Sequence, residues 1–249
     1  VVNNVMRTPI IYAMIPARYG STRLKMKNLA LIDGKPMISY AIEAAIYSNV
    51  FDKVIINSEH SIFEKIAIRY GADFYHRAKN LGSSETRSDA IVFDFMQAYP
   101  EADVIVWVNP TSPFQSSNEI YDVVNHFNEN NLDSLITVEE KQVHCNYEEK
   151  PVNYNPLGLF EQTQDLIPIE PFVYSIMMWR KDIFLSEYNK KGFALFCGKF
   201  GVRTVNKLSG IIIKTADDLK IADLLMRSIN LYDKNYSVKY DKLVEYNKI

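Results

Sequence analysis

Apolar runs of strand length alternate with helix-period segments along most of this chain, and this alternation constrains the fold more than any other feature. Residues 103–108 (Asp-Val-Ile-Val-Trp-Val) form a continuous apolar run, typical of a strand buried on both faces of a sheet. The β-α-β-α order predicts an α/β protein with a mostly parallel, three-layer sheet. The expected strands are 10–16, 53–57, 73–76, 103–108, 134–138, 174–179 and 201–205, and the expected helices are 36–49, 59–70, 84–98, 118–128 and 215–229.

Length and composition fit a single large domain. The chain has 249 residues, of which 47% are hydrophobic, so it can bury a full core. Its net charge of −2 gives no global field that would recruit nucleic acid or an anionic membrane. No apolar run approaches the roughly 20 residues that cross a bilayer, and residues 1–7 lack the apolar centre of a signal peptide. We therefore expect a soluble, cytoplasmic protein with one domain over residues 1–249.

Two segments depart from the regular alternation. Residues 139–171 contain Pro151, Pro156, Pro168 and Pro171 among several aromatic residues, which indicates short strands and turns in an arm. Exposed aromatic residues in this arm would pack on a second subunit, making it a dimerisation insert, or on their own domain; the sequence leaves both open. The Lys-, Tyr- and Asn-rich stretch 230–249 is expected to be a weakly packed tail.

A cluster of positive charge follows the first predicted strand. Arg18, Arg23, Lys25 and Lys27 lie around the bend at Gly20-Ser21. Backbone N–H groups in such a turn, together with Arg and Lys, stabilise a polyanion, and a nucleotide triphosphate is the polyanion expected at the end of an α/β strand. A basic surface loop is the alternative. The two commonest nucleotide motifs, G-x-x-x-x-G-K-[ST] and G-x-G-x-x-G, are absent.

Cysteine and histidine usage gives no sign of a disulfide framework or a zinc site. Cys145 and Cys197 are too few and too far apart for either. The histidines, which show no H-x-x-x-H spacing and are expected to be surface or packing residues, are His60, His76, His126 and His144.

Several motifs together resemble one enzyme family. These are Ile15–Ser21, Lys27-Asn28, Gly34–Pro36 and Asn109–Phe114 (Asn-Pro-Thr-Ser-Pro-Phe), and in order and spacing they are similar to the CMP-sugar synthetases, the acylneuraminate and nonulosonate cytidylyltransferases. Residues 17–24 look like the opening motif of the related Kdo cytidylyltransferases. The resemblance covers roughly residues 10–228. It implies a Rossmann-like α/β fold and transfer of CMP from CTP to an acidic, nonulosonate-like sugar, with release of pyrophosphate and with Mg2+ as cofactor.

The resemblance also implies a set of site residues. Arg18 and Lys27 would be the catalytic cations on the triphosphate, and Ser21 would contact the nucleotide. The remaining expected contacts are Asn28 and Arg77 for cytosine and ribose, Ser88 for the base, and Asn109, Thr111 and Ser112 for the sugar substrate. Each also has an ordinary interpretation, because such residues commonly serve as caps, surface residues or salt-bridge partners.

The expected metal motif is absent. The family carries Asp-x-Asp-Thr before its last helix, where this chain has Ile212–Thr215, and Lys214 replaces a carboxylate. An ammonium group cannot ligate a hard divalent cation. Three explanations stay open: the metal is held by the triphosphate and another acid, with Asp217 and Asp103 as candidates; Lys214 takes part of the metal's charge role; or the transfer reaction has been lost.

The sugar side departs as well. Residues 172–176 lack the arginine that the family would place against the sugar, and Lys141, Lys150 or Arg180 are the candidate substitutes. Thr22-Arg23 replaces the Lys-Gly of the sialic-acid branch.

The leading hypothesis is therefore a CMP-sugar synthetase that acts as a homodimer, because relatives reach across with a similar insert. Two alternatives remain: a catalytically impaired, nucleotide-binding relative that serves as a partner in a glycan pathway, or another sugar nucleotidyltransferase.

Overall fold

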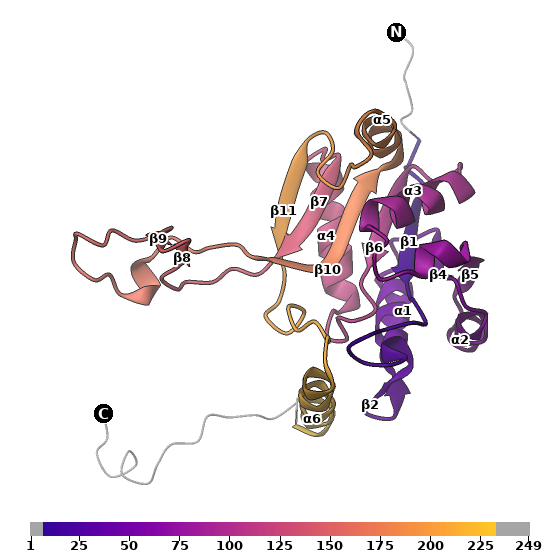
Figure 1. The fold of residues 1–249 in the computed structure, drawn as a ribbon, viewed down its shortest axis with the longest axis horizontal. Coiled ribbons are helices and arrows are strands. Elements are labelled where there is room, and N and C mark those ends of the chain that lie inside the picture. Colours follow the sequence, from indigo (N-terminus) through magenta and orange to yellow (C-terminus); the bar gives the residue numbers. More distant parts are fainter. Residues whose placement is uncertain (1–6, 233–249) are drawn as a thin grey trace.

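A seven-stranded mixed sheet forms the centre of the protein in the computed structural model, which describes residues 7–232 (Figure 1). Its strand order is β11-β7-β10-β6-β1-β4-β5. Neighbouring strands are parallel except that β10 runs antiparallel to both β6 and β7. The prediction of a mostly parallel α/β sheet is confirmed. The strands are β1 Ile11–Pro16, β4 Lys53–Ser58, β5 Asp73–His76, β6 Val104–Val108, β7 Ser134–Val138, β10 Phe172–Arg180 and β11 Phe200–Thr204.

Alternate residues of the central strands point into two separate cores. In β1, Ile11, Ala13 and Ile15 join a cluster that includes buried residues of α1, α2 and α4. Tyr12 and Met14 face the other side, where they join residues of α3 and α5. Because side chains alternate across a strand, this pattern gives the three layers, helices on both sides of the sheet, that the sequence predicts.

The helices mostly begin and end at recognisable signals. Gly71, with φ of 75°, ends α2, and the Ser116 hydroxyl accepts a hydrogen bond from the Glu119 N–H at the start of α4. α3 starts at Ser88 rather than 84, because residues 79–82 form the 3-10 helix η2 and a turn follows it. The helices are α1 Met37–Ser48, α2 Ile62–Tyr70, α3 Ser88–Ala98, α4 Ser117–Glu129, α5 Lys181–Lys191 and α6 Ala216–Tyr232.

A small hairpin packs against the last helix, α6, and holds it to the rest of the molecule. Strands β2 (Leu31–Ile32) and β3 (Lys35–Pro36) pair with each other, and the Asp33 N–H donates to the Asp223 carboxylate of α6 over 2.7 Å. The Thr215 hydroxyl and the Asp218 carboxylate exchange hydrogen bonds with each other's backbone N–H and thereby cap α6. This packing fixes residues 211–215, which precede α6, beside the loop that follows β1. The side chains of the third apolar cluster are Ile32, Met37, Ile213, Ala222 and Met226.

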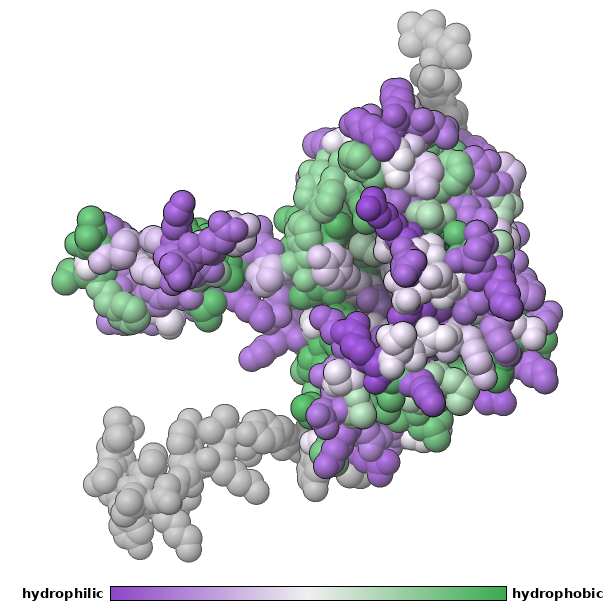
Figure 2. All heavy atoms as spheres, viewed as in Figure 1, coloured by the Kyte–Doolittle hydropathy of each residue, from purple (hydrophilic) through white to green (hydrophobic). Residues whose placement is uncertain are grey.

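Residues 140–170 leave the sheet between β7 and β10 and extend away from it as an arm (Figure 1). The arm contains the short strands β8 (Asn146–Tyr147) and β9 (Lys150–Pro151) and the 3-10 helix η3 (Thr163–Asp165). Three of its large apolar side chains are almost fully exposed: Leu157 95%, Leu159 93% and Phe160 84%. Figure 2 shows apolar surface at the far end of the arm.

Two further sequence predictions concern the tail at residues 230–249 and membrane-spanning segments. Residues 233–249, most of the predicted weakly packed tail, lie outside the described residues. Among the helices within residues 7–232, none combines the length and the apolar character needed to span a bilayer.

Candidate active site

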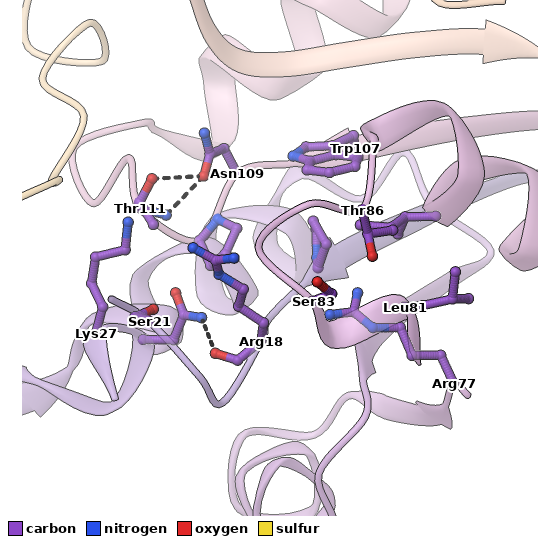
Figure 3. A pocket seen from close by; sticks show the side chains of 14 residues that line it. Arg18, Ser21, Lys27, Arg77, Leu81, Ser83, Thr86, Trp107, Asn109 and Thr111 are labelled. Atoms are coloured by element: carbon purple, nitrogen blue, oxygen red, sulfur yellow. Dashed lines mark hydrogen bonds between the residues drawn. The ribbon is translucent and has the colours of Figure 1, made fainter. Parts of the chain in front are cut away.

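A cavity opens where the carboxyl ends of β1, β4, β5 and β6 meet. The chain runs from β1 through β4 to β5 on one side and then crosses to β6 on the other, so a crevice forms between β1 and β6. Ligands of open α/β sheets bind at such points. The cavity has a volume of about 260 Å³. Its lining residues, most of them labelled in Figure 3, are Pro16, Arg18, Ser21, Lys27, Asn28, Arg77, Leu81, Ser83, Thr86, Ile91, Trp107, Asn109, Pro110 and Thr111.

The cation-rich loop after β1 supplies one wall of this cavity. Residues 27–29 form the 3-10 helix η1, which brings Lys27 and Asn28 to the same cavity as Arg18 and Ser21. Asn28 is buried, and its Nδ2 donates to the Arg18 carbonyl over 3.3 Å, whereas its Oδ1 has no partner. Lys25 is exposed and does not line the cavity.

Lys27 connects this loop to the segment before α6. Its Nζ donates to the Ile213 carbonyl over 3.0 Å. Burial, together with the smaller effects of the positive charges of Arg23, Arg18 and Lys214, lowers the pKa of Lys27 to about 8, against a smaller opposing effect of Asp218. Lys27 is therefore an ammonium group in a strongly positive region, and an anion bound beside it would be stabilised.

Arg77 approaches the cavity from the end of β5. Its side chain is only 2% exposed and pairs with Glu59, at an Nη2–Oε2 distance of 2.8 Å. Burial lowers the pKa of Arg77, and the Glu59 carboxylate opposes this effect. Glu59 also accepts the Tyr19 N–H, and it leaves no room for a side chain at position 82, where a Cβ would lie 2.5 Å from its Cγ and Cδ. Glu59 thus anchors the cation loop and Arg77 together.

Several buried polar atoms around the cavity have no partner in the protein. They are Asn28 Oδ1, Arg77 Nε and Nη1, and Trp107 Nε1. Buried polar groups are almost always hydrogen-bonded, so a group of unpartnered ones on a single cavity indicates a ligand that pairs with them. This is the strongest sign within residues 7–232 that the cavity is a binding site.

The polar side chains of the turn after β6 are hydrogen-bonded to other groups of the protein. Asn109 Oδ1 accepts the Thr111 N–H over 3.0 Å and the Thr111 hydroxyl over 2.9 Å, and Asn109 Nδ2 donates to the Tyr174 carbonyl over 3.0 Å. Asn109 and Thr111 line the cavity as predicted, but their polar groups already have partners. Ser112 is fully buried, does not line the cavity, and donates to the Ser209 carbonyl over 2.7 Å.

The other predicted residues lie away from this cavity. Ser88 starts α3 and is not a lining residue. Arg180 lies at the opposite edge of the sheet, because β10 is antiparallel, and its Nε donates to the Leu132 carbonyl. Lys150 belongs to β9 of the arm, and Lys141 pairs with Glu139 at 3.2 Å.

Sequence reasoning missed Glu59, Leu81, Ser83, Thr86, Ile91 and Trp107. Glu59 follows the end of β4, and Trp107 is the second-last residue of β6. Positions at the carboxyl ends of parallel strands were the signal that could have indicated both residues.

The residues present do not fit a magnesium ion held by side-chain carboxylates. No acidic residue lines the cavity, and within residues 7–232 no group of three or more His, Cys, Asp and Glu residues could hold a metal. Asp103 precedes β6, so it lies at the opposite edge, where its carboxylate accepts the Ile10 N–H and pairs with Arg7. Asp217 is exposed in the first turn of α6.

The fold and the cavity together define an α/β protein with a cation-lined cavity at the carboxyl ends of its strands. A family model described as cytidylyltransferase matches residues 12–235, and the chain belongs to this family.

Characterised relatives match about half of the chain. It is 39% identical over 119 residues to the N-acylneuraminate cytidylyltransferase of Escherichia coli O18:K1:H7, covering 48% of this chain and 28% of the relative. It is 38% identical over 112 residues to the pseudaminic acid cytidylyltransferase of Campylobacter jejuni, covering 45% of this chain and 42% of the relative. It is 32% identical over 115 residues to the CMP-N,N'-diacetyllegionaminic acid synthase of Legionella pneumophila, covering 44% of this chain and 50% of the relative. The matches thus span half or less of each relative.

Solved structures share the fold at low sequence identity. The CMP:2-keto-3-deoxy-manno-octonic acid synthetase complexed with CTP superposes with a TM-score of 0.65 at 17% identity, over 88% of this chain and 99% of that chain. The 4-diphosphocytidyl-2C-methyl-D-erythritol synthase of Anaerococcus prevotii gives a TM-score of 0.66 at 16% identity, with the same coverage.

Proposed function

We propose that this protein transfers CMP from CTP to an acidic, nonulosonate-like sugar and releases pyrophosphate. The observation that carries the proposal is the set of unpartnered buried polar atoms on a cation-lined cavity, in a chain of the cytidylyltransferase family. Three relatives, an N-acylneuraminate cytidylyltransferase, a pseudaminic acid cytidylyltransferase and a CMP-N,N'-diacetyllegionaminic acid synthase, support an acidic sugar as the acceptor.

The cavity offers the groups that such a transfer needs. A sugar hydroxyl oxygen forms a bond to the α-phosphorus of CTP while the bond from that phosphorus to the bridging oxygen breaks. Pyrophosphate leaves with the electron pair, and the hydroxyl proton is released to water. The reaction depends on positioning and on neutralising phosphate charge more than on covalent catalysis. Arg18 and Lys27 would neutralise the triphosphate, and Ser21 would donate to it.

Asn28 and Arg77 favour cytosine as the base of the bound nucleotide. The unpartnered Asn28 Oδ1 is an acceptor that would pair with the exocyclic amino group of cytosine, where uracil presents an oxygen. The free Nε and Nη1 of Arg77 would donate to carbonyl or hydroxyl oxygens of the base and ribose. We therefore expect CTP to be preferred over UTP.

Pyrophosphate release by the purified protein tests this proposal. CTP and Mg2+ would be mixed with a panel of acidic sugars (N-acetylneuraminic, pseudaminic, legionaminic and 2-keto-3-deoxy-manno-octonic acids), with UTP, GTP and ATP as controls. We expect turnover with CTP and one or more of these acids. CTP binding without turnover on any of them would instead favour an impaired relative, and turnover with a sugar phosphate would favour another sugar nucleotidyltransferase.

The arm supports a homodimer as the working form. Leu157, Leu159 and Phe160 of the arm are exposed. The rings of Tyr174, Phe196 and Phe200 each contact Phe172 near the base of the arm, next to which Figure 2 shows apolar surface on the body. Large exposed apolar patches mark interaction sites. We expect a dimer in sedimentation equilibrium and a monomer for the Leu157→Ser, Phe160→Ser variant. A wild-type monomer across the micromolar range would contradict this.

The cytoplasm is the proposed place of the reaction. CTP is a cytoplasmic nucleotide, and both cysteines, Cys145 and Cys197, are free thiols, as is usual in a reducing compartment.

A further inference from the structure

Positive charge gathers at one end of the cavity without an acidic partner among the lining residues. Arg18 and Lys27 line this end, and Arg23 and Lys214 lie close enough for their charges to act on Lys27. We call these four residues the cation end. A divalent cation would be repelled here, whereas a triphosphate would be attracted.

The position of Lys214 is set by fixed elements. Ile213, the residue before it, is fully buried; its N–H donates to the Thr111 carbonyl over 2.9 Å, and its carbonyl accepts the Lys27 ammonium over 3.0 Å. The Lys214 N–H is bound by the Asp218 carboxylate over 2.8 Å. The backbone at 213–214 is therefore tied to the cavity wall, to the cation loop and to α6, and the exposed Lys214 side chain starts from a fixed point beside Lys27.

Asp218, an acid whose charge acts on Lys27, is already engaged in a helix cap. Asp218 accepts the backbone N–H groups of Lys214 and Thr215, both over 2.8 Å, and these bonds hold its pKa below the usual range. Its carboxylate thus caps α6, and moving it to a metal ion would leave the helix start without its cap.

We propose that Lys27 and Lys214 supply the charge neutralisation for which a protein-held divalent cation would otherwise be needed, so that the cavity binds the metal-free triphosphate of CTP. This inference rests on the proposed function, since it takes CTP as the ligand. Ammonium groups would contact the phosphate oxygens directly, where the family resemblance implies a metal ion held by two acids.

Titration calorimetry of CTP in excess EDTA and in excess MgCl2 tests the inference without requiring turnover. For the wild-type protein we expect the two dissociation constants to agree within about threefold. A protein that binds CTP in MgCl2 but at least about tenfold more weakly in EDTA would overturn the inference while leaving the proposed function intact. A protein that binds CTP in neither buffer would overturn the proposed function as well.

Substitution of Lys214 sharpens the same measurement. Lys214→Asp should weaken CTP binding in EDTA by about tenfold or more, and MgCl2 should restore much of the loss, because a carboxylate repels phosphate directly but ligates a bridging magnesium ion. Lys214→Gln should weaken binding equally in both buffers. Lys220→Asp is the matched control: it makes the same charge change on an exposed residue of α6 and should leave CTP affinity unchanged. Equal CTP binding by Lys214→Asp and wild type in EDTA would refute the role of Lys214.

Discussion

At the amino edge of the central sheet, Asp52 and Asp103 each accept a backbone N–H at the entrance to β1, over 2.8 Å. At the carboxyl edge, Asn28 Oδ1 and two nitrogens of Arg77 are buried without partners. Both edges are formed by the ends of the same strands. The difference in hydrogen bonding therefore depends on which side chains stand at each edge. The two carboxylates at the amino edge complete the structure, whereas these three atoms of Asn28 and Arg77 at the carboxyl edge are left for a ligand. Four experiments would test this contrast.

Loss of Arg77 should have the largest effect. Arg77→Ala removes the cation paired with Glu59, whose side chain is 11% exposed in the wild-type protein, and we expect this to cost about 3 kcal/mol of unfolding free energy. Urea unfolding measures this cost. The double variant Arg77→Met, Glu59→Gln should recover most of the stability but not CTP binding. Recovery of both would mean that Arg77 serves the structure alone.

Removing a cation at each edge compares the two directly. Arg18→Ala should weaken CTP binding by about 1.5–3 kcal/mol, the value of a charge-assisted hydrogen bond, and leave the unfolding midpoint nearly unchanged. Arg7→Ala removes the partner of Asp103 at the amino edge and should leave CTP affinity unchanged. Calorimetry on both variants measures the difference; equal losses of affinity would abolish the distinction between the edges.

The pH dependence of CTP binding reports on Lys27. Its pKa of about 8 in the free protein should rise when a triphosphate binds, so binding takes up a proton and affinity falls as pH rises above 8. We expect roughly tenfold weaker binding at pH 9 than at pH 7, by the protonated fraction of a group with that pKa. The unfolded chain holds this proton up to a higher pH, so the stability of the free protein should increase with pH over the same window. A pH-independent affinity in Lys27→Met is the control.

Tryptophan fluorescence gives the smallest and most local test. The chain has two tryptophans: Trp107 lines the cavity with an unpartnered indole N–H, and Trp179 is fully buried with its N–H donating to the Leu195 carbonyl over 3.0 Å. CTP, alone or followed by the accepted sugar, should change the emission of the wild type but not of Trp107→Phe. Affinity should fall by about 1 kcal/mol in this variant. A persisting emission change would assign the signal to Trp179.

The sequence predicted the sheet well because its strands are short apolar runs bounded by turn residues. It did not predict α5, in which only Phe184 is buried, so no apolar stripe marks the helix. It also could not show that β10 is antiparallel, because strand direction depends on how the chain returns to the sheet. That direction moves Arg180 to the amino edge, away from the site.

The site was predicted where its residues are adjacent in the sequence. Arg18, Ser21, Lys27 and Asn28 come from one loop, and all of them line the cavity. Glu59 was missed because its role depends on a contact with a distant arginine. Asp103 was proposed as a metal ligand although it precedes its strand; the rule that parallel strands share their carboxyl edge would have excluded it.

The arm has a consequence for how the molecule can be redesigned. Its two ends are joined by hydrogen bonds: the Glu139 N–H donates to the Pro171 carbonyl, and Lys141 and Ile169 exchange hydrogen bonds in both directions. The arm is therefore the long loop of a hairpin formed by β7 and β10. The entropy of closing a loop grows only slowly with its length, by about 0.6 kcal/mol per doubling. A chain in which a short turn replaces residues 142–168 should fold with an unchanged sheet and bind CTP, which would separate nucleotide recognition from the proposed self-association through the arm.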